Sequence, residues 1–190
     1  IEFLQGVSVT QPTPAQAKAT GVALGQMHSA LADFDQTRPN SLGLLSWRPL
    51  AEQCTAQGLE DIYEGLAKRV EAECDFLEER WPKNLPQRAI HADLFPDNVL
   101  MLGDRVTGLI DFYFACTDAL GYDLAVTHSA WCFTNDGTRF QSDLSANLLR
   151  GYDSVHGFDA PTRDALPLFF RGACLRFLLT RCYDWINTPA

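Results

Sequence analysis

The chain has 190 residues, a length that suits one packed domain or two small ones. Of these residues 46% are hydrophobic and 21% charged, a composition that excludes a disordered or collagen-like chain. Its 24 acidic and 15 basic residues give a formal net charge of −9, which argues against nucleic acid or an anionic membrane as a partner. No apolar run reaches the roughly 18 residues of a membrane span. The six cysteines are scattered and form no C-x-x-C pair, so we expect reduced thiols in a cytoplasmic protein.

The N-terminal part begins with a short, apolar, strand-like stretch over residues 1–4. A helix is predicted over residues 14–33, because Thr13 and Gln16 form a capping box around a proline at the first helical position. Prolines and a glycine over residues 39–49 then indicate a loop-rich passage.

A second helix is predicted over residues 59–80, where apolar side chains recur with helical spacing until Trp81 and Pro82 stop it. Its buried stripe is expected to contain Ile62, Leu66, Val70, Cys74 and Leu77. The pattern then becomes that of strands, with a short apolar step over 88–90 and a hairpin formed by 99–102 and 106–110. Three further helices are predicted near 122–134, 140–155 and 162–186. The expected fold class is therefore mainly α with a small central β-hairpin.

Polar residues gather at the two ends of the predicted hairpin. Asp93 and Asn98 lie in the segment that enters the hairpin, and Asp111 follows its second strand. Because a two-stranded hairpin returns its end to its start, we expect Asn98 and Asp111 to be neighbours. Oxygen-bearing side chains that face one point suit Mg²⁺, which takes one or two protein oxygens and completes its shell with phosphates and water.

The spacing of these residues matches a phosphoryl-transfer pattern. In H-x-D-x-x-x-x-N the Asp accepts the proton of a substrate hydroxyl and the Asn binds a metal ion, and a second Asp, before Phe, holds Mg²⁺ on the nucleotide phosphates. Here these positions are His91, Asp93, Asn98 and Asp111. The alternative is structural, with Asp93 and Asn98 capping a loop and Asp111 ending a strand.

The segment His91-Ala92-Asp93-Leu94-Phe95-Pro96-Asp97-Asn98, with Ile110-Asp111-Phe112, resembles the aminoglycoside phosphotransferase and choline kinase group of protein-kinase-like enzymes. More narrowly, the chain resembles the kinase-like bacterial homoserine kinases along most of its length, from Thr13 to Pro189. The stretches that carry this narrower resemblance are 38–42, 91–98, 109–116, 130–133 and 171–181.

The resemblance implies the C-terminal, catalytic lobe of a protein-kinase-like α+β fold without its N-terminal lobe. Residues 1–12 would be the hinge segment from that missing lobe, and 13–190 a single helical catalytic domain. None of the three lysines lies on a predicted strand, so the groups that cover the ATP phosphates are expected upstream of Ile1. In the family the hinge backbone binds adenine, which makes Glu2 and Leu4 nucleotide-binding candidates; alternatively, Glu2 is only a solvated terminal residue.

The resemblance also assigns roles to residues around the hairpin. Asp93 would be the catalytic base and His91 would support its loop, while Asn98 and Asp111 would bind Mg²⁺. Asp123 matches an acidic residue that accepts hydrogen bonds from the backbone of the catalytic loop. Its alternative role is that of an acidic residue in the first turn of a helix, where the helix dipole favours it.

The implied activity is that of a small-molecule kinase, the ATP-dependent phosphorylation of the side-chain hydroxyl of L-homoserine in threonine biosynthesis. A substrate carboxylate calls for an arginine fork, and the last predicted helix carries Arg171, Arg176 and Arg181, which cannot all share one face. We favour Arg176, which is flanked by apolar residues, then Arg171; either could instead pair with acids or be solvated. Tyr113 is a further candidate for the pocket, whereas Trp131 is expected to pack in the core.

Other functions remain open at this stage. The acceptor could be another small alcohol, such as an aminoglycoside, choline or a thio-sugar, and these mostly cationic or neutral substrates would call for an acidic pocket. A kinase-like module that binds a partner without catalysis is the alternative outside enzymes. The intact set of Asp93, Asn98 and Asp111 disfavours it, because such a module needs none of them.

Overall fold

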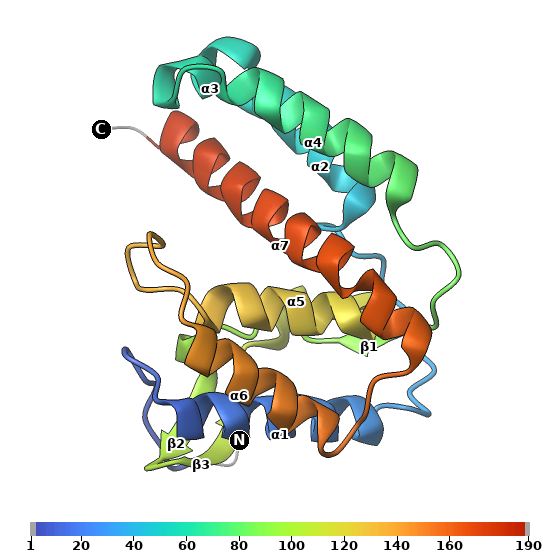
Figure 1. The fold of residues 1–190 in the computed structure, drawn as a ribbon, viewed down its shortest axis with the longest axis vertical. Coiled ribbons are helices and arrows are strands. Elements are labelled where there is room, and N and C mark those ends of the chain that lie inside the picture. Colours follow the sequence, from blue (N-terminus) through green and yellow to red (C-terminus); the bar gives the residue numbers. More distant parts are fainter. Residues whose placement is uncertain (1–2, 189–190) are drawn as a thin grey trace.

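The computed structural model describes residues 3–188, which form helices around two small antiparallel sheets (Figure 1). The helices are α1 (Pro14–Ala30), α2 (Leu44–Cys54), α3 (Ala56–Ile62), α4 (Leu66–Arg80), α5 (Leu120–Trp131), α6 (Ser142–Asp153) and α7 (Ala160–Asn187). The strands are β1 (Gln87–Ile90), β2 (Val99–Leu102), β3 (Arg105–Leu109) and β4 (Cys116–Ala119), and two short 3₁₀ turns, η1 (Pro96–Asn98) and η2 (Phe112–Phe114), complete the elements. The predicted dominance of helices is confirmed.

Helix α1 begins as its sequence predicts. The Thr13 hydroxyl accepts a hydrogen bond from the Gln16 N–H at 3.2 Å, and the Gln16 side chain accepts one from the Thr13 N–H at 3.0 Å. The helix ends at Ala30, earlier than the predicted Asp33. Upstream of α1, the strand expected over residues 1–4 is absent from the described positions 3 and 4, and Val7 instead forms a single bridge to Met101.

The passage over residues 39–49 was predicted to be a loop, and this is wrong because α2 occupies its second half. Trp47 anchors α2, since its ring is buried and its indole N–H donates to the Leu42 carbonyl at 2.9 Å. Pro49 deprives only the Leu45 carbonyl of its intrahelical donor, and Leu45 is 90% exposed, so solvent reaches this side of the helix. Tertiary packing of an aromatic residue therefore outweighs the propensity of proline.

The helix predicted over residues 59–80 is two helices. The break lies at Gly65, whose φ of +76° is left-handed and favours glycine. Ile62, at the end of α3, is 38% exposed and does not belong to the buried stripe. The other four members, Leu66, Val70, Cys74 and Leu77, are buried as predicted.

The predicted hairpin is present as β2 and β3, joined through Gly103 with φ +62°. A second sheet was not predicted, in which β1 pairs antiparallel with β4 and Ile90 lies opposite Cys116. Both sheets are short, and the residues between their strands contain the polar positions of interest. The ends of β1 and β3 and the starts of β2 and β4 therefore meet in one region.

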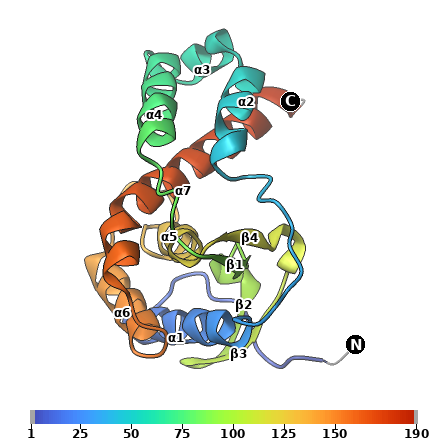
Figure 2. The same cartoon turned by 90° about the vertical axis from the view of Figure 1, so that its right-hand side faces the viewer.

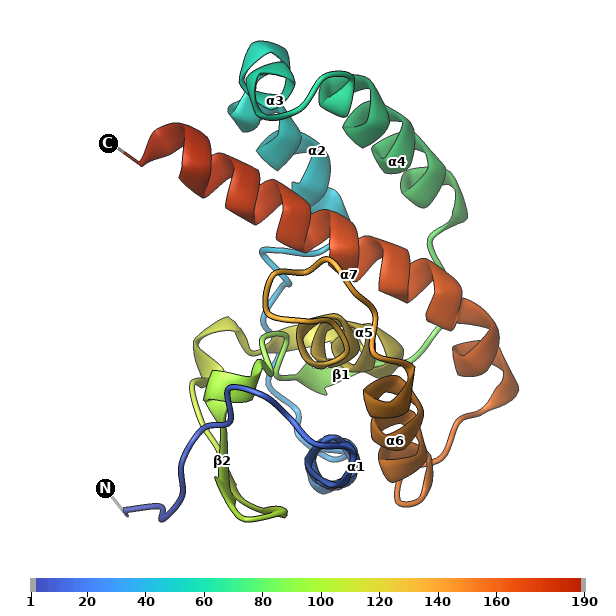
Figure 3. The same ribbon diagram turned by 60° about the vertical axis from the view of Figure 1, so that its left-hand side comes forward.

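Helix α7 lies between two groups of helices, with α2, α3 and α4 on one side and α5, α6 and α1 on the other (Figures 1, 2 and 3). One apolar core, containing Trp47, Leu77, Tyr122 and Phe169, joins α7 to α2, α4 and α5. A second core, containing Leu24, Leu94, Met101, Leu148 and Tyr152, joins α1, α5 and α6 to the hairpin. Helix α5 contributes to both cores, so the residues at its N-terminal turn are held firmly.

Helices α1 and α6 approach closely at two glycines. A Cβ atom added to Gly21 would lie 2.1 Å from the Leu148 carbonyl oxygen, and one added to Gly151 would lie 2.1 Å from that of Lys18. All six cysteines are free thiols and five are buried, as expected. Within the described residues, no helix combines the length and the apolarity needed to cross a bilayer.

Candidate active site

The loop over residues 91–98 connects β1 to β2 and rests on the N-terminal turn of α5. The carboxylate of Asp123, in that turn, is fully buried and accepts hydrogen bonds from the backbone N–H of His91 at 2.9 Å and of Ala92 at 2.7 Å. These bonds agree with the loop-supporting role expected for Asp123. They fix the backbone immediately before Asp93.

Asp123 has a third partner that the sequence did not indicate. His28 of α1 is buried, and its Nε2 lies 2.9 Å from Asp123 Oδ2, while its Nδ1 lies 2.9 Å from the Tyr152 hydroxyl of α6. Burial opposes ionisation of Asp123, but the hydrogen bonds from His28 and from the His91 backbone outweigh it and hold the pKa of Asp123 below its ordinary value. The loop therefore rests on a buried carboxylate that is ionised at neutral pH.

Ala92 adopts a left-handed conformation, with φ +62°. This conformation costs a residue with a Cβ roughly 1–2 kcal/mol. Both of its backbone groups are bound, because its N–H donates to Asp123 and its carbonyl accepts a hydrogen bond from Arg176 Nη1. The surrounding structure thus imposes the turn that sets the direction of the Asp93 side chain.

The Asp93 carboxylate is partly exposed and accepts a hydrogen bond from Arg176 Nη2 at 3.0 Å. Burial raises the pKa of Asp93 above its ordinary value, and the nearby Arg176 opposes this only in part. A carboxylate with a raised pKa is a better proton acceptor. The Asp93 backbone carbonyl accepts hydrogen bonds from Phe95 N–H and Asn98 Nδ2, both at 2.8 Å, which close the loop on itself.

His91 links this loop to the end of the hairpin. Its Nδ1 accepts a hydrogen bond from the Asp93 N–H at 3.3 Å, so the proton of the neutral ring is assigned to Nε2, which donates to the Ile110 carbonyl at 3.0 Å. The ring also packs on Phe112, with 4.6 Å between centroids. His91 thereby couples the position of Asp93 to that of Asp111.

Asn98 and Asp111 are neighbours, as the hairpin argument predicts, because the Ile110 N–H donates to the Asn98 carbonyl at 3.0 Å. Asp111 has φ +60°, and one of its carboxylate oxygens accepts a weak bond from the Tyr113 N–H at 3.4 Å. The Asn98 Nδ2 donates to Asp93, so its Oδ1 is left without a donor among the described residues.

These oxygens fit a magnesium ion. Within residues 3–188, no group of three His, Cys, Asp or Glu side chains is placed to hold a metal by itself. Mg²⁺ does not need such a group, since one or two protein oxygens suffice when phosphates and water supply the others. Asn98 Oδ1 and the Asp111 carboxylate are ligands of this type.

Arg176, a candidate for substrate binding, contacts the loop itself. It is only 3% exposed, both of its Nη atoms are bound to Ala92 and Asp93, and its Nε has no hydrogen-bond partner. Arg171 lies elsewhere, because five residues rotate a helical side chain by roughly 140°. It forms two hydrogen bonds with Glu73, at 2.7 and 2.5 Å, and covers the Phe76 ring at 3.9 Å. Arg171 is therefore paired with an acid, which is the alternative role expected for it, and its binding of substrate stays a prediction.

The other candidates that the structure describes are not members of the loop over residues 91–98. Tyr113 is 71% exposed, and its carbonyl accepts a hydrogen bond from Arg38 at 2.7 Å. Leu4 lies against Gly108 of β3, whereas Glu2 falls outside the described residues. Trp131 is buried and donates to the Leu94 carbonyl at 2.9 Å, which confirms its place in the core.

The geometry defines a class: a mainly helical lobe in which Asp93, Asn98 and Asp111 gather at one end of a hairpin, on a loop held from beneath by a buried carboxylate. Residues 1–158 match the phosphotransferase enzyme family, and the chain belongs to this family. Over its whole length it is 49% identical to homoserine kinase of Methylorubrum populi and 51% identical to homoserine kinase of Brucella anthropi. It spans 58% and 57% of the lengths of these two relatives.

Solved structures give the same fold. An aminoglycoside-3'-phosphotransferase of type VIII superposes with a TM-score of 0.61 at 26% identity, over 93% of this chain and 67% of that protein. Choline kinase from Cryptosporidium parvum superposes with a TM-score of 0.69 at 17% identity, over 98% of this chain and 66% of that protein. The expected fold class, the catalytic lobe of a protein-kinase-like phosphotransferase, is confirmed.

Proposed function

We propose that the protein to which this chain belongs transfers the γ-phosphoryl group of ATP to the side-chain hydroxyl of L-homoserine, a step of threonine biosynthesis. The observation that carries the proposal is the identity of about half of all residues, along the entire chain, with proteins named homoserine kinase. The hydrogen-bonded loop around Asp93 supports it, because it offers the groups that phosphoryl transfer to an alcohol needs.

In this proposal Asp93 accepts the proton of the substrate hydroxyl. Arg176 holds one of its carboxylate oxygens, and His91 and Asn98 fix the loop on both sides of it. The raised pKa of Asp93 makes proton transfer to it less unfavourable. Asn98 and Asp111 would hold Mg²⁺, which neutralises charge on the ATP phosphates when it is bound.

The nucleotide would also contact residues upstream. Residues 3–12 form no helix and only the single bridge from Val7 to Met101, which supports 1–12 as a hinge segment and 13–190 as the helical domain. Backbone atoms of Glu2 and Leu4 would then bind the adenine. An N-terminal lobe of the same protein would supply the lysine that contacts the phosphates.

The test is a panel of alcohols with the purified full-length protein, ATP and Mg²⁺, followed by release of ADP. L-homoserine, choline, an aminoglycoside and a thio-sugar would be compared at equal concentrations. We expect the highest kcat/KM for L-homoserine, and a tenfold preference for any other member would overturn the proposal.

A further inference from the structure

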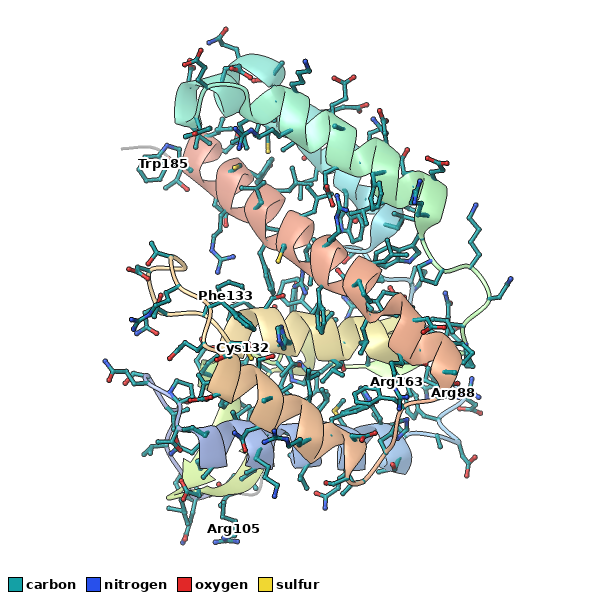
Figure 4. All side chains as sticks on the ribbon, viewed as in Figure 1. Arg88, Arg105, Cys132, Phe133, Arg163 and Trp185 are labelled. Atoms are coloured by element: carbon teal, nitrogen blue, oxygen red, sulfur yellow. The ribbon has the colours of Figure 1, made fainter. Side chains whose placement is uncertain are left out.

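A groove of about 860 Å³ lies beside the catalytic loop, between α7 and the segment that joins α5 to α6. Phe95, Pro96 and Asp97 of the loop form part of its wall. Phe133, just after α5, and Trp185, near the C-terminal end of α7, also line it and lie on the left side of the molecule in Figure 4. A groove whose lining begins at Phe95, two residues after Asp93, is a natural place for the acceptor substrate.

One face of α7 forms the opposite wall. The lining residues from this helix recur every three or four positions, at Cys174, Phe177, Leu178, Arg181, Cys182 and Trp185. This spacing places them on a single face. Among the described residues that line the groove, Arg181 is the only one with a positively charged side chain.

Arg181 differs from the two arginines that precede it most closely on α7. Arg171 is paired with Glu73 and Arg176 with Asp93, whereas Arg181 forms no ion pair within residues 3–188. Its Nη1 makes only a long contact, 3.5 Å, to the Phe177 carbonyl of its own helix. Its guanidinium is therefore free to bind an anion.

The ring of Phe177 lies close both to Arg181 and to residues around Asp93. The guanidinium carbon of Arg181 lies 5.4 Å from the ring centroid, and that of Arg176, which binds Asp93, lies 5.1 Å from it. Phe95, two residues after Asp93, packs against the same ring at 5.0 Å. Four bonds, each of about 1.5 Å, separate the homoserine hydroxyl oxygen from its carboxylate carbon. A compact amino acid could thus extend from Asp93 past Phe177 toward Arg181.

We propose that Arg181 binds the α-carboxylate of the substrate and that the carboxylates of Asp97 and Asp136, which also line the groove, receive its α-ammonium group. The inference rests on the proposed function and deepens it, because it makes the acceptor class an α-amino acid with a side-chain hydroxyl. Arg176, whose two Nη atoms are bound to the loop, then acts as a positioning residue for Asp93. Hydrogen bonds from Thr134 and Thr138 lower the pKa of Asp136 to about 2, so this carboxylate is ionised.

The test compares two substrates and three variants of the full-length enzyme. L-homoserine carries the carboxylate, and 3-aminopropan-1-ol is the same alcohol without it. Arg181→Met removes the guanidinium with similar length, and Arg181→Lys keeps the charge. Arg163→Met is the matched control, because Arg163 is an exposed arginine of the same helix, near its opposite end (Figure 4).

We expect Arg181→Met to lower kcat/KM for L-homoserine at least about 30-fold, mainly through KM, since a charge-assisted fork is lost. The kcat/KM for 3-aminopropan-1-ol should stay within twofold, Arg181→Lys should recover part of the loss, and Arg163→Met should match wild type. An equal loss for both alcohols, or no loss, would overturn the inference and leave the kinase function standing. A wild-type enzyme that phosphorylates no homoserine would overturn the proposed function and this inference with it.

Discussion

Replacing the buried carboxylate beneath the catalytic loop is the sharpest test of how this site is built. Asp123→Asn preserves size and shape but removes the charge. The carboxylate accepts three hydrogen bonds, from the backbone N–H groups of His91 and Ala92 and from the ring of His28. An asparagine accepts at only one oxygen, so its amide nitrogen must face at least one N–H donor.

The magnitude follows from these three bonds. Hydrogen bonds to a charged group contribute about 1.5–3 kcal/mol each, and about half of that when the acceptor is neutral. The variant loses one bond outright and weakens the other two, while it no longer has to bury a charge. We expect the free energy of unfolding to fall by about 3–5 kcal/mol, because the lost and weakened bonds together remove roughly 3–6 kcal/mol and the relief of charge burial offsets part of that.

Urea denaturation at pH 7, followed by tryptophan fluorescence, measures this change. The matched control is Asp104→Asn in the exposed hairpin turn, which should stay within about 0.5 kcal/mol of wild type. Hydrogen exchange of the peptide that contains His91 and Ala92 should accelerate only in the Asp123 variant. A loss below about 1 kcal/mol, with unchanged exchange, would refute the reasoning that this carboxylate holds the loop.

The pH dependence has a definite sign. The pKa of Asp123 is lower in the folded protein than its ordinary value, so its charge stabilises the fold above the unfolded pKa of about 3.9. This contribution is lost as the pH falls through the lower, folded value. The difference between wild type and Asp123→Asn should therefore be constant above about pH 5 and shrink in acid.

Three further outcomes are expected. Asp93→Asn in the full-length enzyme should lower kcat at least about 100-fold with little change in Mg-ATP binding, and near-normal turnover would remove Asp93 from the mechanism. Asp111→Ala should shift the Mg²⁺ dependence of activity to higher concentrations, and superimposable titrations would contradict its role as a ligand. Gly151→Ala should destabilise the fold by more than about 2 kcal/mol in thermal unfolding, because its Cβ would meet the Lys18 carbonyl at 2.1 Å. The control is Arg150→Ala, at the neighbouring position. Equal melting temperatures for the two variants would show that α1 and α6 can separate at little cost.

Features encoded over a few residues were predictable from the sequence. The capping box at Thr13, the hairpin turn at Gly103 and the spacing of Asp93, Asn98 and Asp111 depend on neighbours close in the chain. The hairpin also brings its two ends together, so the proximity of Asn98 to the strand end followed from local geometry. A motif that encodes chemistry in eight consecutive residues needs no knowledge of the rest of the fold.

Contacts between distant segments were decided only by the tertiary structure. Helix α2 forms in spite of Pro49 because Trp47 finds a core made of α5 and α7, and β4 becomes a strand because β1 lies beside it. His28 reaches Asp123 across 95 positions, and Arg176 reaches Asp93 across 83. Such pairs leave no local signature, since any buried polar residue on a helix has the same periodicity as an apolar one.

The arginines of α7 show the same division. The sequence predicts that Arg171, Arg176 and Arg181 occupy different faces, because five-residue steps rotate a helix by roughly 140° each. It does not say what each face meets. Packing of α7 between two groups of helices directs the first toward Glu73, the second toward Asp93 and the third into the groove. Helix geometry thus set the angles between these side chains, and the long-range burial of apolar surface determined the partners at those angles.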